Sequence, residues 1–259
     1  MTQPIHGGIA STPVWSMRSA AGSREIATAG VDLPTAATDY EDGGDIALLD
    51  MDAQTDARSW VFWLNTASAA AYRALISKMG APPYTGWSVE LWNDDTLKLE
   101  LVGLTTGTGH TRVTTTNAVA DGNWHHCAIA YAGSGDASGV TMYIDGRRET
   151  NVVKVNTAHT TSSVNATAVR FGRRADDTLT VSASLLDVRV YGRELMPDEI
   201  TQIWKGDGND GNRSALLARW PCIGSPGAAA SILADMAAGN NLTGSGSPVF
   251  VAASRPVLL

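Results

Sequence analysis

The stretch 121–149 constrains the fold more than any other part of this chain of 259 residues. Residues 124–131 read as a strand with side chains that alternate between two faces. A loop rich in Gly, Ser and Asp follows, and residues 140–144 then alternate as a half-buried strand. Asp145-Gly146 comes directly after, and this dipeptide favours a hairpin because both central turn positions need positive φ. Three antiparallel strands so close in sequence indicate an all-β domain.

Three further segments support this fold class. Residues 59–65 (SWVFWLN) are apolar on both faces, which is typical of a central strand covered on both sides. Residues 87–91 and 97–101 alternate apolar and polar side chains around a turn at 93–95, which predicts a hairpin with one apolar and one polar face. Pro197 and the two acidic residues after it suit the start of a helix, so we expect the one helix at Pro197–Lys205.

Shorter apolar or alternating runs predict the remaining strands. We expect them at residues 46–49, 75–78, 112–116, 152–155, 169–172, 179–183, 185–191 and 216–220, with a turn at 240–244. The sequence has no repeat of 20–50 residues and no sign of a second domain.

The motif Asp-Gly-Asn-Trp-His-His at 121–126, with Met-Tyr-Ile-Asp-Gly at 142–146, resembles the laminin-G-like branch of the concanavalin A-like lectin/glucanase superfamily. Residues 62–64 (Phe-Trp-Leu) resemble its early strand, and residues 185–200 resemble its closing strand and short helix. The resemblance implies an all-β, two-sheet antiparallel jelly-roll sandwich with one short helix and extended terminal arms. It says less about function, because this sandwich carries lectins, glucanases, adhesins and virion proteins.

The organisation along the chain follows from composition. Residues 1–39 are rich in Ala, Gly, Ser, Thr and Pro, so we expect an extended N-terminal arm there. The sandwich is placed at 40–205, and a C-terminal extension that packs on it at 206–259. The arm has too few large apolar groups to offset an ordering cost of about 1–2 kcal/mol per residue. It must therefore lie on the chain's own sandwich or on another molecule, and both options stay open.

The charge balance narrows the class of partner. A net charge of −7 argues against nucleic acid, because phosphate binding needs clustered Lys and Arg. No window approaches the ~20 apolar residues of a membrane span, and the first residues do not read as a secretion signal. Cys127 falls in a strand and Cys222 in a Pro/Gly-rich region, so two free buried thiols are favoured over a disulfide.

Catalytic and metal motifs are weak. A glucanase of this superfamily would carry Glu-x-Asp-x-x-Glu on one strand, and residues 90–94 come nearest without the second Glu. His125 and His126 are adjacent in a strand and face opposite sides, so they do not suit one metal ion. We therefore expect neither an enzyme nor a cofactor.

Calcium is a closer question. Residues Asp207–Asn212 alternate oxygen donors with glycines as in part of a calcium loop, and Asp39–Asp45 is a second acidic turn. Turns use the same residue types without a metal. The chain also departs from the family at Leu186, where an Asp is usual, and at Met196, where a helix-capping Ser is usual. We leave calcium open at both turns and predict no metal site.

A glycan site needs an exposed aromatic ring beside amides or carboxylates. Trp92 ends a strand off the inward-facing set, next to Asn93 and Asp94, and Tyr84 follows two prolines. These four residues are the candidate ligand-binding residues. The alternative for Trp92 is that it covers the edge of the sandwich or contacts a protein partner.

The function expected from these observations is a non-catalytic structural or attachment module, with virion or extracellular-surface location after assembly. A phage capsid decoration or tail component is the favoured setting, with self-association or capsid and tail partners held through the terminal arms. A lectin-like carbohydrate-binding module of a cell-surface or secreted protein is the alternative, and a divergent glycosidase is the third.

Overall fold

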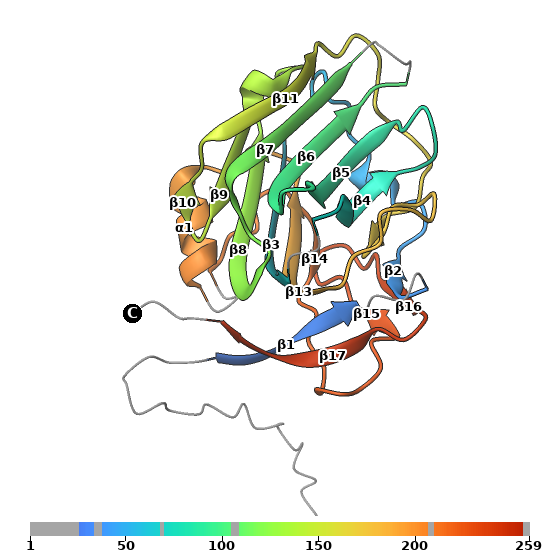
Figure 1. Ribbon diagram of the computed structural model, residues 1–259, viewed down its shortest axis with the longest axis vertical. Helices are drawn as coiled ribbons and strands as arrows, with labels where there is room; N and C mark the ends of the chain where they lie inside the picture. Colours follow the sequence, from blue (N-terminus) through green and yellow to red (C-terminus); the bar gives the residue numbers. More distant parts are fainter. Residues whose placement is uncertain (1–25, 34–37, 68–69, 105–108, 207–209, 256–259) are drawn as a thin grey trace, which may run out of the picture.

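The computed structural model describes residues 26–33, 38–67, 70–104, 109–206 and 210–255. Within these ranges the chain forms two antiparallel sheets packed face to face, with one short α-helix, α1 (Pro197–Lys205), at the bounds predicted from the sequence (Figure 1). The predicted all-β sandwich of the concanavalin A-like type is confirmed. No helix in the described part of the chain is long and apolar enough to cross a membrane.

Sheet I contains the strands predicted in residues 121–149. Its strand order is β10 (Arg147–Arg148), β9 (Val140–Ile144), β8 (Asp121–Tyr131), β3 (Arg58–Ala67), β13 (Ala183–Tyr191), β1 (Ile26–Leu33), β17 (Val249–Arg255). A further strand, β14 (Leu216–Trp220), lies outside this order and pairs with β13.

Sheet II carries the hairpin predicted around residues 93–95. Its order is β11 (Asn151–Thr157), β7 (His110–Ala118), β6 (Thr96–Val102), β5 (Gly86–Leu91), β4 (Arg73–Met79), β12 (Arg170–Phe171), β2 (Tyr40–Asp42), β16 (Leu242–Ser245), β15 (Ile232–Leu233).

The main core lies between the sheets, where every second residue of each long strand points inward. Trp60 of β3 and Trp87 of β5 meet there with ring centroids 5.3 Å apart, and both are buried. Cys127 and Cys222 are free and buried, as the sequence favoured. On the other face of sheet I, Ile200 and Ile203 of α1 pack over Val61, Ala128 and Tyr143, which explains why residues 59–65 are apolar on both faces.

Both ends of the described chain belong to the sheets. Residues 26–33, inside the predicted arm, form β1, and its Val31 and Leu33 lie in the core with no exposed surface. Residues 1–25, the rest of the predicted arm, lie outside the described residues. In the predicted C-terminal extension, β14 and β17 add to sheet I while β15 and β16 add to sheet II.

Three local predictions are wrong. Residues 47–49, expected in a strand, form the 3-10 turn η1 (Ala47–Leu49), in which the Leu49 amide donates to the Ile46 carbonyl. Residues 179–182 are not a strand, because Leu179 takes a positive φ of 55° and β13 begins only at Ala183. The expected turn at 240–244 overlaps β16, which hydrogen-bonds to β2.

Candidate binding site

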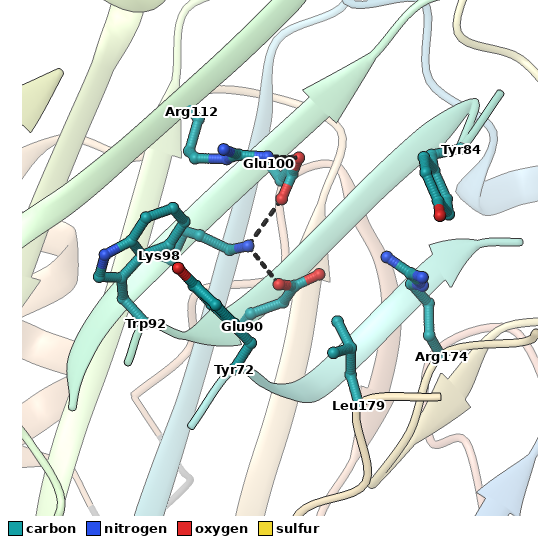
Figure 2. A pocket seen from close by; sticks show the side chains of 9 residues that line it. All are labelled: Tyr72, Tyr84, Glu90, Trp92, Lys98, Glu100, Arg112, Arg174 and Leu179. Atoms are coloured by element: carbon teal, nitrogen blue, oxygen red, sulfur yellow. Dashed lines mark hydrogen bonds and ion pairs between the residues drawn. The ribbon is translucent and has the colours of Figure 1, made fainter. Parts of the chain in front are cut away.

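A pocket of about 240 Å³ opens on the outer face of sheet II, opposite the apolar core (Figure 2). Strands β5 and β6 form its floor, and side chains from β7, from the strand ends and from the β12–β13 connection form its walls. Its lining residues are Tyr72, Tyr84, Glu90, Trp92, Lys98, Glu100, Arg112, Arg174 and Leu179.

Side chains of the β5–β6 hairpin alternate between the two faces of sheet II, and this alternation places the residues of the floor. Val89 and Leu99 point into the core, so Glu90, Lys98 and Glu100 project from the opposite face. The register sets Glu90 directly across from Lys98. Three charged side chains of alternating sign therefore meet at one place on the sheet.

Lys98 joins the two carboxylates of the floor. Its Nζ forms an ion pair with Glu90 and lies 2.6 Å from Glu100 Oε2. The other Glu100 oxygen accepts from Arg112 at 2.6 Å and contacts His110 Nε2 at 2.9 Å. Burial alone would raise the pKa of Glu100, but the His110 hydrogen bond and the charge of Lys98, with Arg112, hold that pKa well below its usual range. Glu100 is thus a fully neutralised anion.

Glu90 is less completely paired. Its side chain has no exposed surface, and its Oε2 contacts Lys98. Its Oε1 is buried and has no hydrogen-bond partner among the described residues. A buried carboxylate oxygen without a donor is costly, and such oxygens are normally satisfied by protein, water or ligand. The floor of the pocket therefore contains a hydrogen-bond acceptor, Glu90 Oε1, that has no donor among the described residues.

Trp92 and Tyr72 make one wall. Their rings meet edge to face with centroids 4.7 Å apart and an interplanar angle of 81°. The Trp92 ring is also in cation–π contact with Lys98 at 5.0 Å and with Arg112 at 5.1 Å. These contacts hold the indole half-buried at the side of the pocket rather than free at a hairpin tip.

Tyr84 and Arg174 make the facing wall. The guanidinium lies 4.5 Å from the centre of the Tyr84 ring. Arg174 Nη2 donates to Asp176 Oδ2 at 2.7 Å and to Thr178 Oγ1 at 3.0 Å, and Nε donates to Asp176 Oδ1 at 3.1 Å. Among the described residues, Arg174 Nη1 donates no hydrogen bond. The β12–β13 connection thus fixes this wall and leaves one donor free.

The structure brings two of the four predicted site residues together. Tyr84 and Trp92 line the pocket from opposite sides, whereas Asn93 and Asp94 are exposed and do not line it. Asp94 Oδ1 instead accepts from the amide and hydroxyl of Thr96, at 3.2 and 2.6 Å, and closes the turn. Whether these residues bind a ligand stays a prediction.

Sequence reasoning missed the charged floor. The alternation of residues 87–91 and 97–101 puts Glu90, Lys98 and Glu100 on the polar face but did not indicate their burial, whereas all three are buried. The available signal was the alternation of negative and positive side chains on the polar face of the predicted hairpin. Arg174 and Leu179 gave no local signal, because only the tertiary fold brings their loop to β5.

The floor does not suit acid–base catalysis. Lys98 contacts both Glu90 and Glu100, so two carboxylates lie beside each other, as in the carboxylate pair of a glycosidase. Each carboxylate of such a pair must be free to reach the substrate, whereas both oxygens of Glu100 are held by Lys98, Arg112 and His110. The arrangement can donate and accept hydrogen bonds to a ligand.

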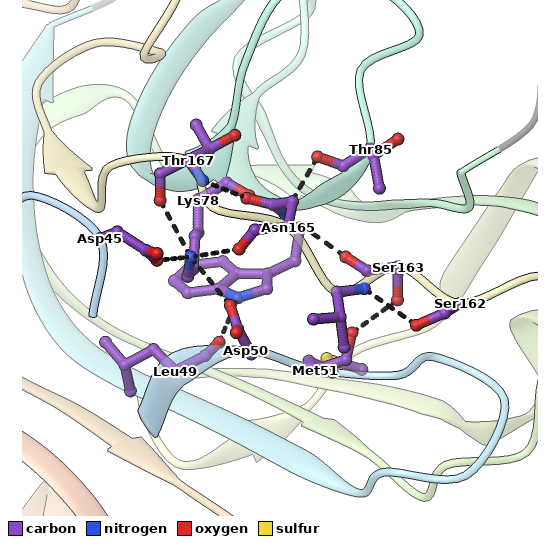
Figure 3. Close-up of polar contacts among 12 residues, drawn as sticks. Asp45, Leu49, Asp50, Met51, Lys78, Thr85, Ser162, Ser163, Asn165 and Thr167 are labelled. Carbon is purple, nitrogen blue, oxygen red and sulfur yellow. Dashed lines mark hydrogen bonds and ion pairs between the residues drawn. The ribbon is translucent and has the colours of Figure 1, made fainter. Parts of the chain in front are cut away.

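Near one end of sheet II, a second buried lysine is enclosed by oxygens (Figure 3). Lys78 Nζ lies 2.7 Å from Asp45 Oδ1 and 2.9 Å from Asp50 Oδ1. It also donates to the carbonyls of Asn165 and Thr167, each at 2.9 Å. One ammonium therefore links β4 to two connecting segments of the chain.

Both acidic turns considered for calcium contain carboxylates paired with cations of this chain. In the first, Asp45 pairs with Lys78 and Asp42 with Arg170, whose Nε lies 2.8 Å from Asp42 Oδ2. In the second, Asp210 pairs with Arg189, while residues 207–209 lie outside the described ranges. Within the described residues, no group of three or more His, Cys, Asp or Glu side chains could hold a metal ion.

The adjacent histidines diverge as expected. His125 Nδ1 lies 2.8 Å from Asp145 Oδ2, and its Nε2 lies 3.1 Å from Asp121 Oδ1. The hydrogen bond to Asp145 is the main cause that raises the pKa of His125. His126 is buried with its ring edge against Trp63, at a centroid distance of 5.2 Å. The pair does not form a ligand set.

Sequence comparison decides the family. The pattern of the family described as the concanavalin A-like lectin/glucanases superfamily, of the laminin G type, matches residues 38–201. The chain belongs to this superfamily. Among curated proteins, none matches the sequence.

Solved structures that resemble this chain include binding proteins. A candidate carbohydrate-binding protein from Bacteroides ovatus ATCC 8483 has a TM-score of 0.60 at 12% identity, over 90% of this chain and 62% of its own. The binding domain of Paraclostridial Mosquitocidal Protein 1 has 0.46 at 15%, over 60% and 38%. A heptameric SAP-like pentraxin from Limulus polyphemus has 0.47 at 13%, over 71% and 84%. The chain thus spans less than two thirds of the first two, and identities this low show the fold alone.

Proposed function

We propose that this superfamily member is a non-catalytic attachment module that binds carbohydrate in the pocket of sheet II. One observation carries the proposal: aromatic rings stand on both sides of a floor that holds a buried, incompletely paired carboxylate. A sugar presents apolar C–H faces that pack on aromatic rings, and hydroxyls that donate to carboxylates. Ligand pockets typically combine such surfaces with a few placed polar groups.

Two further points support the proposal. The superfamily includes lectins, and the paired carboxylate of Glu100 in the floor does not suit acid–base catalysis. The Bacteroides ovatus protein that shares 90% of this chain's fold is described as a candidate for carbohydrate binding, and this supports a similar role here. A divergent glycosidase is less well supported, because both oxygens of Glu100 are held by Lys98, Arg112 and His110.

A glycan array with the purified protein tests the proposal. We expect a defined set of glycans to bind, and Trp92→Ala and Tyr84→Ala each to weaken that binding at least about tenfold by removing one wall. Tyr40→Ala is the matched control, since the Tyr40 ring also stacks on an arginine of sheet II, Arg170 of β12, at 4.8 Å, but lies outside the pocket.

Stability must be measured beside binding. Trp92 is half-buried at a surface, so Trp92→Ala should change the free energy of unfolding by no more than about 1 kcal/mol. Loss of binding with an intact melting transition supports the pocket. Failure to bind any glycan, or equal binding by all variants, would overturn the proposal.

Attachment within an assembly, such as a phage capsid or tail, is the second candidate function, and one observation favours a protein partner. β1 pairs with β13 only through Val31–Leu33, and no described strand pairs with residues 26–30 along that edge. Free strand edges accept an added strand through backbone hydrogen bonds. A virion or extracellular location stays a prediction.

Light scattering tests self-assembly. We expect the full chain to form oligomers that depend on concentration, and a chain without residues 1–25 to remain monomeric with an unchanged melting temperature. The deletion spares β1, because Val31 and Leu33 are part of the core. A full chain that stays monomeric at high concentration would contradict association through its own arm.

A further inference from the structure

The unused hydrogen-bonding groups of the pocket specify more than a general affinity for sugars. Glu90 Oε1 is an acceptor without a donor, and Arg174 Nη1 is a donor without an acceptor among the described residues. The carboxylate of Glu90 and the guanidinium of Arg174 face each other across the pocket (Figure 2). A ligand that satisfies both must present a donor and an acceptor within one small region of its surface. Two adjacent hydroxyls meet this requirement, because each can donate or accept.

The charges of the pocket disfavour an ionic ligand. Glu100 is already neutralised by Lys98, Arg112 and His110, so its charge is not available to a cationic ligand. The ring faces of Trp92 and Tyr84 are likewise in contact with cations of the chain. An anion near Arg174 would meet the incompletely paired Glu90, and like charges repel strongly when buried. A neutral ligand avoids both conflicts.

The dimensions favour a ligand of one ring. Pockets for drug-sized ligands typically measure about 300–1,000 Å³. This pocket, at about 240 Å³, lies below that range. The Trp92–Tyr72 pair and the Tyr84–Arg174 pair stand on opposite sides of the floor, so a ring that reaches Glu90 must enter between them (Figure 2). A terminal sugar fits this shape, whereas an internal unit would need room for its chain on both sides.

We propose that the pocket takes the neutral terminal pyranose of a glycan and holds two adjacent hydroxyls, one donating to Glu90 and the other accepting from Arg174. This inference rests on the proposed function and names the ligand class of the same site. Glu90 and Arg174 act as specificity-determining residues, and Asp176 positions Arg174 through its two hydrogen bonds.

Calorimetric titration with free monosaccharides tests the ligand class. The probes are glucose, galactose and mannose, their C6 uronic acids, and the corresponding 2-amino sugars. We expect at least one neutral sugar to bind, and its uronic acid and amino counterparts to bind at least about tenfold more weakly. A uronic acid or amino sugar that binds as tightly as its neutral parent would overturn the neutral class.

Two variants test the residue assignment. Glu90→Gln should weaken the neutral sugar by about tenfold, because hydrogen bonds to a charged acceptor are stronger than those to an amide. Arg174→Met should do the same, while Arg173→Met, altered at the neighbouring position outside the pocket, should bind as the unaltered protein does. Melting curves of each variant separate loss of a contact from loss of the fold. Unchanged affinity in a folded Glu90→Gln protein would overturn the assignment.

The outcomes separate this inference from the proposed function. If array glycans bind at the pocket but no free monosaccharide does, the pocket binds internal units of a glycan. The inference of a terminal ring then fails, while carbohydrate binding stands. If neither glycans nor monosaccharides bind, both fail together.

Discussion

Sheet II contains two buried lysines whose surroundings differ, although both lie on strands and both pair with two carboxylates. Lys78 uses its three N–H groups in hydrogen bonds to Asp45, Asn165 and Thr167 and adds an ion pair with Asp50. Lys98 has one hydrogen bond and one ion pair, and the ion-pair partner Glu90 keeps an oxygen without a donor.

The difference bears on the proposed binding site. Buried polar groups are nearly always satisfied, so a fully paired lysine such as Lys78 has its chemistry completed by the fold. The Lys98 cluster has spare hydrogen-bonding capacity and borders a pocket, which is where a ligand can complete it. The useful signal is therefore the oxygen left without a donor rather than the buried charge.

The largest effect is expected at Lys78. Lys78→Met removes the ammonium that joins β4 to Asp50 and to the carbonyls of Asn165 and Thr167, and those oxygens lose this donor. We expect a loss of about 3–5 kcal/mol in the free energy of unfolding, measured by urea denaturation. A loss below about 1 kcal/mol would show that Lys78 is not a structural link.

Glu41 is a buried ionisable group that has no counterion among the described residues, and it extends the comparison. Glu41 is fully buried on β2, its two oxygens have no hydrogen-bond partner in the described structure, and burial raises the pKa of this carboxyl to about 8. The folded state therefore binds a proton that the unfolded state releases above its lower pKa of 4.5.

The sign of the pH dependence follows directly. Stability from this group is complete below pH 4.5 and is lost as the pH rises toward 8, by at most about 1.4 kcal/mol per pH unit. Glu41→Gln should flatten this slope in denaturant titrations at pH 5, 6.5 and 8. An equal slope in both proteins would assign the pH dependence to other groups.

The smallest of these effects is expected at Lys98. Lys98→Met leaves Glu90 without its cation, but water can enter the pocket, so we expect a loss of about 2 kcal/mol in unfolding free energy. Adding Glu90→Gln should recover at least half of that loss, because it removes the unpaired charge. A double-mutant cycle measures this coupling, and strictly additive effects would contradict the pairing.

Local signals in the sequence predicted much of the fold. The bounds of α1 are correct even though Met196 replaces the usual capping residue, because Glu199 Oε2 accepts from the Met196 amide at 2.9 Å. The hairpin of β5 and β6 was readable because its alternation is regular on both sides of a turn. In contrast, β16 and β17 contain Gly, Ser and Ala without a clear period, and only pairing with β2 and β1 makes them strands.

The site was predictable only in part, for a similar reason. Trp92 and Tyr84 stand out locally as aromatic residues beside turns. Burial of Glu90 depends on side chains from β6 and from the loop of Arg174, about 80 residues further along the chain. Facing can be read from a two-residue period, whereas burial of a polar face needs the three-dimensional neighbours.

The pairing of β1 with β17 has a mechanical consequence. Seven residue pairs join the two strands, from Ile26 opposite Arg255 to Asp32 opposite Val249, so the described chain enters and leaves the fold side by side (Figure 1). A force that pulls the two flanking segments apart loads the hydrogen bonds of this ribbon one pair at a time, beginning at Ile26. Two strands that separate one residue pair at a time open at a lower force than two strands that are sheared along their length. A tether at one flank alone does not pull β1 and β17 in opposite directions, so we expect the ribbon to stay closed at forces that open it when both flanks are held.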